Sequence, residues 1–181
     1  MNKNLILRLI TLLLIGVNMF VIFNFSSEKA ETSRVTSKKV TETVLEITVK
    51  DYEIKPEPEK KALVKKFDVK IRSLAHFSEY TLLGFLLALH LSLYKLTKIK
   101  KASLAAAGCL LYALSDEIHQ IYVPGRSFQF SDLLVDTLGG LLGILILFIF
   151  AFILKKITKK PAVSSAVLVR DKSPKNHDFG T

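Results

Sequence analysis

The sequence predicts an all-α integral membrane protein, a helical bundle with four transmembrane helices. Half of its 181 residues are apolar, although 26 side chains are basic and 16 are acidic, so charged and apolar residues must occupy separate blocks. Four of the apolar blocks are about 20 residues long, which is the length that a helix needs to cross a bilayer core. Polar residues within three of these blocks recur at helical spacing, which favours a bundle with a shared interior.

The first predicted span is an uncleaved membrane helix. Lys3 and Arg8 give it the basic start of a signal peptide, but its apolar run is long and the SSEKAE that follows is a poor cleavage site. The third span is apolar only as far as Leu114 and then becomes polar. The four predicted spans cover residues 5–25, 74–94, 102–122 and 132–154.

The segment between the first two spans, residues 26–73, divides into two parts. Its first part is polar with a run of β-branched residues, and we expect a flexible or weakly extended loop there. In its second part Leu63, Phe67 and Ile71 recur every fourth residue among lysines. That spacing predicts an amphipathic helix that lies on the outer surface and leads into the second span. A solvated linker is the alternative for this part.

Basic residues in the short connections indicate the orientation of the spans. The connection 95–101 carries four lysines in seven residues and the tail begins KKITKK, whereas the opposite short loop, 123–131, holds only Arg126. Because positively charged short loops stay in the cytoplasm, we expect a multi-pass protein of the plasma membrane with both termini cytoplasmic. The twelve basic and nine acidic residues of the 26–73 segment oppose this assignment, but short loops weigh most in that rule.

The expected partner of this chain is the membrane lipid bilayer. The net charge of +10 is explained by basic residues that flank apolar spans, and in the absence of a nucleic-acid motif we expect no nucleic-acid partner. Cys109 is the only cysteine, which excludes an intramolecular disulfide and indicates a packing residue. The expected parts are the first span (1–25), an extracytoplasmic loop (26–73), a three-span core (74–154) and a cytoplasmic disordered tail (155–181).

Three of the predicted spans carry polar residues on one helical face, in each case at the outer end. In the fourth span, Gly139 and Gly143 continue this face inward with the G-x-x-x-G spacing that lets another helix approach closely. Charged faces in lipid turn toward each other, so we expect one shared pocket that includes Arg126 from the PGR turn. The faces consist of Arg72, His76, Glu79 and Tyr80; of Tyr112, Asp116, His119 and Gln120, with Ser115 and Glu117 at the margins; and of Asp132 and Asp136.

The residue types in this pocket favour acid–base chemistry. Histidines beside carboxylates supply titratable pairs whose pKa values can be pushed apart by their surroundings. Arg126 would offset the carboxylates or bind an anionic ligand through its two-pronged guanidinium. We therefore predict acid–base groups at His76, Glu79, Asp116, Glu117 and His119, and ligand-binding residues at Arg72, Tyr80, Gln120, Arg126, Asp132 and Asp136.

A structural network and a metal site are the two alternatives for the same polar residues. A structural network would hold the helices together, although hydrogen bonds between spans average only about 0.6 kcal/mol in one measured system. A metal site could use carboxylates and histidines, but the sequence has no H-E-x-x-H or comparable spacing. The metal candidates are His76, His119, Asp116, Asp132 and Asp136, and the sequence indicates no particular metal or other cofactor.

Three motifs of the sequence resemble those of the VanZ-like family. They are R-x-x-x-H-F-x-E-Y from Arg72 to Tyr80, S-D-E-I-H-Q-x-Y-V-P-G-R from Ser115 to Arg126, and D-x-x-x-D-x-x-G from Asp132 to Gly139. The resemblance covers about residues 70–154. It leaves the first span and the 26–73 segment outside, so that segment is expected to be an addition of this protein.

The resemblance implies a role in the bacterial cell envelope. The namesake of the family is an accessory protein of glycopeptide resistance in Gram-positive bacteria, which lowers susceptibility to teicoplanin. The resemblance names no reaction, so two classes of function stay open. The first is a membrane enzyme that acts on a lipid-linked or cell-wall precursor. The second is a non-enzymatic module that binds an anionic head group or transports a proton, and a purely structural accessory subunit is a further alternative.

Overall fold

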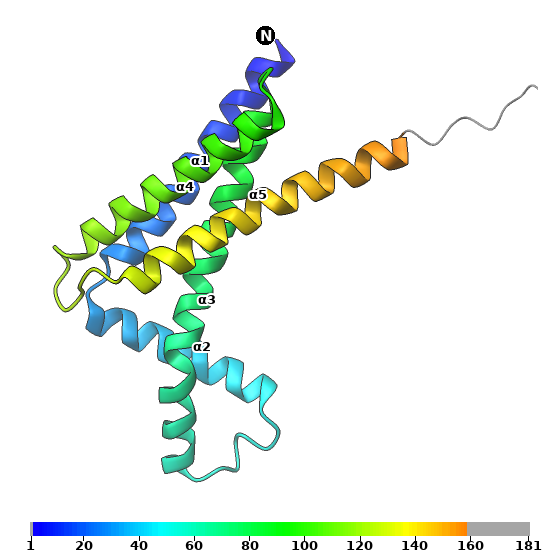
Figure 1. Ribbon diagram of the computed structural model, residues 1–181. Helices are drawn as coiled ribbons and strands as arrows, with labels where there is room; N and C mark the ends of the chain where they lie inside the picture. The colour runs from blue at the N-terminus through cyan, green and yellow to red at the C-terminus, as the bar shows by residue number, and fades with distance from the viewer. Residues whose placement is uncertain (1, 159–181) are drawn as a thin grey trace, which may run out of the picture. The chain divides into compact units, whose positions relative to one another are not determined.

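The computed structural model describes residues 2–158, which form five α-helices and no strand (Figure 1). The predicted all-α class is therefore confirmed for this part of the chain. Residues 155–158, the start of the tail that was expected to be disordered, belong to α5 instead. The rest of the predicted tail lies outside the described residues. The helices are α1 (Lys3–Ser27), α2 (Ala30–Thr48), α3 (Glu57–Ser92), α4 (Lys98–Gln120) and α5 (Phe130–Thr158).

Three of the described helices, α1, α3 and α5, are long and apolar enough to cross a membrane. The third predicted span also forms a helix, α4, but α4 does not share that composition. Its first turns carry Lys98, Lys100 and Lys101, and its last turns carry Asp116 and Glu117, so the apolar stretch between them is short. Three candidate spans are supported, and the fourth stays a prediction.

The polar first part of the 26–73 segment forms the helix α2, so the prediction of a flexible or extended loop was wrong there. Packing accounts for the difference. Leu45 and Tyr52 are buried against Val64 of α3, and helices gain most of their stability from such an apolar face. The β-branched residues that suggested extended structure disfavour a helix by only a few tenths of a kcal/mol each relative to alanine. Packing can offset a cost of that size.

The helix α3 joins two predicted elements into one. The predicted helix through Leu63, Phe67 and Ile71 is confirmed, and it continues into the second span without a break. A helix of 36 residues is about 54 Å long, whereas the hydrocarbon core of a bilayer is about 30 Å thick. One end of α3 must therefore extend well beyond the core, and this end forms a hairpin with α2 through Leu45, Tyr52 and Val64.

The interior of the described chain is built where α1, α3 and α4 meet and where α5 crosses α3. Ile22 of α1, Leu83 of α3 and Ala113 of α4 belong to one buried cluster. At the crossing, a β-carbon at Gly139 or Gly143 would overlap backbone carbonyl oxygens of α3. The close helix approach expected from these two glycines is therefore confirmed. All contacts described below lie within residues 2–148.

Candidate functional site

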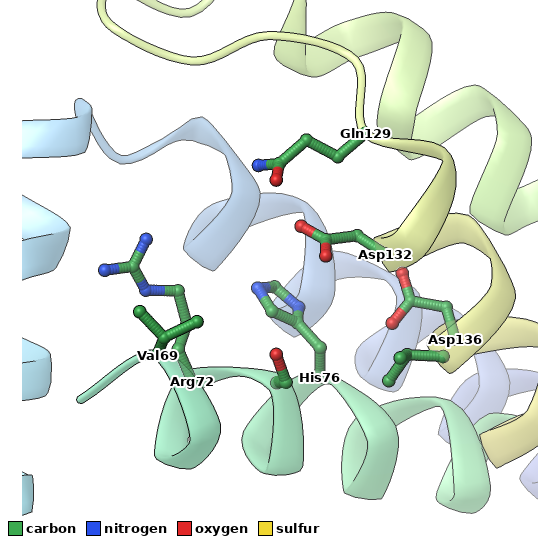
Figure 2. Close-up of a pocket in the computed structure, with 8 residues that line it drawn as sticks. Val69, Arg72, His76, Gln129, Asp132 and Asp136 are labelled. Atoms are coloured by element: carbon green, nitrogen blue, oxygen red, sulfur yellow. The ribbon is translucent and has the colours of Figure 1, made fainter. Parts of the chain in front are cut away.

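A cavity of about 170 Å³ lies between α3 and α5 (Figure 2). Figure 2 shows the ring of His76, from α3, pointing into the space between the two helices, where the carboxylates of Asp132 and Asp136 from α5 also lie. We call this space the α3–α5 cavity. It is lined by Val69, Arg72, Ser73, His76, Gln129, Asp132, Val135 and Asp136.

The helix crossing places these side chains opposite one another. Gly139 has no side chain, so its Cα approaches the backbone of Phe77, the residue that follows His76. Asp136 lies nearly one turn before Gly139 on the same face of α5, because residues three apart are neighbours on a helix surface. The glycine contact therefore brings Asp136 opposite His76. Asp132 lies one further turn along, and the structure brings these three predicted residues together.

His76 also contacts a carboxylate of its own helix. Its Nδ1 lies 3.5 Å from Oε2 of Glu79, three residues on. Glu79, Asp136 and Asp116 lie near enough to act on the charge of His76. One imidazole thus lies beside carboxylates of its own helix and of α5, which are two of the three polar faces that were predicted to meet.

The two predicted carboxylates of α4 are buried and hydrogen-bonded. Asp116 is 3% exposed, and its Oδ2 accepts hydrogen bonds from Oγ of Ser26 at 2.7 Å and from Nε2 of Gln120 at 3.3 Å. Glu117 is fully buried, and its Oε2 accepts a hydrogen bond from the backbone N–H of Gln129 at 2.7 Å. Asp116 thereby joins α4 to α1, and Glu117 joins α4 to the loop before α5.

His119 faces the end of α1. Its Nε2 lies 3.0 Å from Oγ of Ser27, and its ring centroid lies 4.6 Å from that of Phe23. Asp116 and His119 share no hydrogen bond within the described chain, and each of the two bonds a different serine of α1. The structure thus separates the two predicted histidines, with His76 at the cavity and His119 at the α1 contact.

Arg126 holds the end of α1. Its Nε donates a hydrogen bond to the carbonyl oxygen of Glu28 at 2.9 Å, and its Nη2 donates one to that of Phe25 at 3.1 Å. The carbonyl of Glu28, at the end of α1, has no partner within the helix and is satisfied by Arg126, whereas that of Phe25 also accepts the backbone N–H of Glu28 at 3.4 Å. Burial, together with the nearby charge of Arg72, lowers the pKa of Arg126 from its ordinary value, while Asp116, Glu28 and Glu117 oppose this.

A second cavity, of about 230 Å³, lies beside the first and is mostly walled by α1, α2 and α3. We call it the α2–α3 cavity. Arg72 and His76 line both cavities, and Glu79 lines only this one. Arg72 is held in part by Asp68, one turn before it, at 3.5 Å. The remaining lining residues are Phe25, Glu28, Ser33, Thr36, Ser37, Val40, Ile71 and Ala75.

Several buried polar atoms around these cavities have no hydrogen-bond partner within the described chain. An unsatisfied buried polar group costs about 1–3 kcal/mol, and native proteins keep few of them. Their concentration in one region indicates a place where water or a ligand supplies the missing bonds. The atoms are Nε of Arg72, Oη of Tyr80, Oε1 of Glu117 and Oδ1 of Asp136, while Nδ1 of His76 and Oε2 of Glu79 have only each other, at 3.5 Å.

The sequence profile of the family described as VanZ/LLP1 matches residues 11–151. The chain belongs to the VanZ/LLP1 family. No curated protein and no solved structure gives a significant match. The family match begins within α1 and runs through α2, whereas the motifs alone had suggested that the resemblance starts near residue 70. The 26–73 segment therefore lies inside the matched region of this VanZ/LLP1 protein.

The sequence did not reveal the part that α1 plays in the site. Ser26 and Ser27 bond Asp116 and His119, yet α1 had been considered only as a membrane anchor. The sequence did hold a signal for this role, because Ser26 belongs to a stripe of residues at helical spacing that runs along α1. This stripe is the buried face of α1. That stripe consists of Thr11, Ile15, Asn18, Ile22 and Ser26, at spacings of three and four residues.

The candidate residues of the VanZ/LLP1 protein are all at least half-buried. Tyr80, Asp116, Glu117, Gln120 and Asp136 are buried, and the other six are half-buried. Among the described residues, no three histidine, cysteine or acidic side chains are arranged to hold a metal ion. The arrangement supports proton transfer and anion binding at His76 and Arg72, and it adds nothing in favour of the metal alternative.

Proposed function

We propose that this VanZ/LLP1 protein acts in the bacterial cell envelope on a lipid-linked or other envelope molecule, with His76 as the group that donates or accepts a proton. The observation that carries the proposal is the position of His76. It lines both cavities, lies 3.5 Å from Glu79, and faces Asp132 and Asp136 across the α3–α5 cavity.

The neighbours of His76 suit acid–base work. Histidine is the side chain whose charge changes most readily near neutral pH, and a carboxylate at one ring nitrogen fixes the ring so that the other nitrogen can exchange a proton. Glu79 takes that place, since it contacts Nδ1. Arg72, the fixed positive charge shared by both cavities, binds an anionic part of the substrate.

We further propose that the protein crosses the plasma membrane with both termini in the cytoplasm. The residues His76, Glu79, Asp132 and Asp136, which we call the His76 cluster, then lie at the outer surface. The four lysines of the 95–101 connection and the KKITKK after the last span support this orientation. An outward cluster meets cell-wall precursors and glycopeptides. A change in teicoplanin susceptibility is the expected phenotype of the protein.

A second function, cation or proton binding without turnover, is favoured by one observation. Carboxylates outnumber basic groups around His76, and Asp136 is buried with Oδ1 unpartnered within the described chain. Such groups line proton pathways in membrane proteins. This function predicts that the phenotype depends on the transmembrane pH gradient and that no envelope precursor accumulates when the protein is lost.

The test compares lipids and cell-wall precursors in a deletion strain that expresses either the wild-type protein or His76→Gln. Glutamine keeps a polar side chain but cannot exchange a proton near neutral pH. The proposal predicts that a precursor accumulates in the deletion strain, disappears with the wild-type protein and remains with His76→Gln. Normal precursor levels with His76→Gln, at wild-type protein abundance, would contradict it.

A further inference from the structure

The two cavities differ in the side chains around them. Arg72, His76 and the two aspartates of α5 give the α3–α5 cavity a polar wall. The α2–α3 cavity has an apolar part instead, formed by Phe25, Val40, Ile71 and Ala75. One polar space and one partly apolar space, adjacent and joined at the same arginine and histidine, match a molecule with a polar head and a hydrocarbon chain.

The α2–α3 cavity reaches the surface of the protein. Phe25 and Val40 line it and are 47% and 48% exposed, so its rim is apolar and open. The cavity also lies near the ends of two predicted spans. Phe25 is the last apolar residue of the first span, and Ala75 is among the first residues of the second. The cavity therefore lies beside the same end of both predicted spans, which is the level expected for the boundary between hydrocarbon and lipid head groups.

Among the described residues, Arg72 is the one arginine or lysine that lines the two cavities, and the carboxylates of Glu28, Glu79, Asp132 and Asp136 line them as well, so an anionic head group can be held only at Arg72. Arg72 lines both cavities, and its Nε is buried without a partner in the described chain.

We propose that the cavities bind a membrane lipid with a phosphate head group, which places its hydrocarbon chain in the α2–α3 cavity and its phosphate at Arg72, beside His76. Arginine binds phosphate through two parallel hydrogen bonds, which selects it over an uncharged head group. The inference rests on the proposed function for its site and names the class of molecule that the site receives. It gives α2 the role of a wall for the lipid chain.

The experiment measures lipid binding to the full-length purified protein by native mass spectrometry from a neutral detergent. The probes are phosphatidic acid, diacylglycerol with the same chains, and inorganic phosphate as a competitor. Phosphatidic acid is expected to bind at least about tenfold more tightly than diacylglycerol, which corresponds to one good charge-assisted contact. Inorganic phosphate at millimolar concentration is expected not to displace it, because it lacks the chain.

Two variants locate the binding, each with a matched control. Arg72→Gln is expected to weaken phosphatidic acid binding about tenfold, whereas Lys65→Gln, on an exposed position of the same helix, is expected to leave it unchanged. Ala75→Trp fills the α2–α3 cavity and is expected to weaken binding while the Arg72–Asp68 contact persists. Leu74→Trp, at a position that is 63% exposed and lines neither cavity, is its control.

The results that overturn the inference are distinct. Equal binding of diacylglycerol, or tighter binding of a cationic lipid, would exclude a phosphate lipid. Displacement by inorganic phosphate would show a site for the free anion. Equal effects of Arg72→Gln and Lys65→Gln, with no effect of Ala75→Trp, would place the lipid elsewhere. If no phosphatidic acid binds but His76→Gln still changes precursor levels, the inference fails and the proposed function stands. If phosphatidic acid binds as expected but His76→Gln leaves precursor levels normal, the proposed function fails and the lipid site stands.

Discussion

Replacing Arg126 by alanine tests whether this residue acts on α1 or on the carboxylates. The substitution removes the hydrogen bonds to the carbonyls of Glu28 and Phe25, at 2.9 and 3.1 Å. A hydrogen bond to a charged group contributes about 1.5–3 kcal/mol when partly buried, and the more exposed of the two contributes less. We expect Arg126→Ala to lower the free energy of unfolding by about 2–3 kcal/mol, and Arg126→Lys, which keeps the charge but not the fork, by about half of that.

The assay is equilibrium unfolding of the purified protein in mixed micelles, followed by circular dichroism. Arg34→Ala is the matched control, since Arg34 is exposed on α2 and its loss should change stability by less than about 0.5 kcal/mol. Unchanged stability of Arg126→Ala, with loss of function at normal abundance, would contradict a role of Arg126 in holding α1. It would show that the guanidinium serves the site directly rather than the end of α1.

Three further predictions concern the crossing of α3 and α5, the polar residues of α4 and the orientation of the spans. Gly143→Val should destabilise the protein strongly because its side chain would overlap the backbone of α3, whereas Gly16→Val, with open space around it, should be tolerated; thermal unfolding of both variants distinguishes them. Asp116→Asn and His119→Ala should abolish the glycopeptide phenotype at normal membrane abundance, because asparagine can still accept the hydrogen bond of Ser26 at the buried position 116 and water can reach the half-buried position 119; blots beside susceptibility assays check this, and parallel loss of protein would indicate a structural network. Single cysteines in a Cys109→Ser background should react with an impermeant thiol reagent in intact cells on the outer side only, and the reverse pattern would place the His76 cluster inside. Labelling is expected at positions 40 and 128 and protection at positions 98 and 165.

The helices that the sequence predicted best are those whose apolar residues decide their structure alone. The helices α1, α3 and α5 have the length and composition of membrane spans, and their positions agree with the predicted ones. The helix α2 was missed because it is polar and its stability depends on Leu45 packing against a residue nearly twenty positions away in α3. Such a tertiary contact leaves almost no periodic signal in a short polar segment.

The site was predictable to the extent that it follows helical periodicity. Two of the three faces, each read from its own helix, meet at His76 and Asp136, because residues on one face of a helix stay together however the helices pack. The face of α4 bonds α1 and the loop before α5 instead. The position of Arg126 could not be read in this way. It depends on the turn between α4 and α5, where Ala30 donates a backbone hydrogen bond to the carbonyl of Pro124 and draws the end of α1 within reach.

The role of His76 as a proton-exchanging group is tested by the teicoplanin susceptibility of a deletion strain that carries His76→Gln, measured beside the membrane abundance of the variant. His90→Gln is the control, because His90 lies on the same helix about 21 Å away and bonds Thr11 at the other end of α1. We predict that His76→Gln fails to restore the wild-type susceptibility at normal abundance and that His90→Gln restores it. Full restoration by His76→Gln would contradict the account.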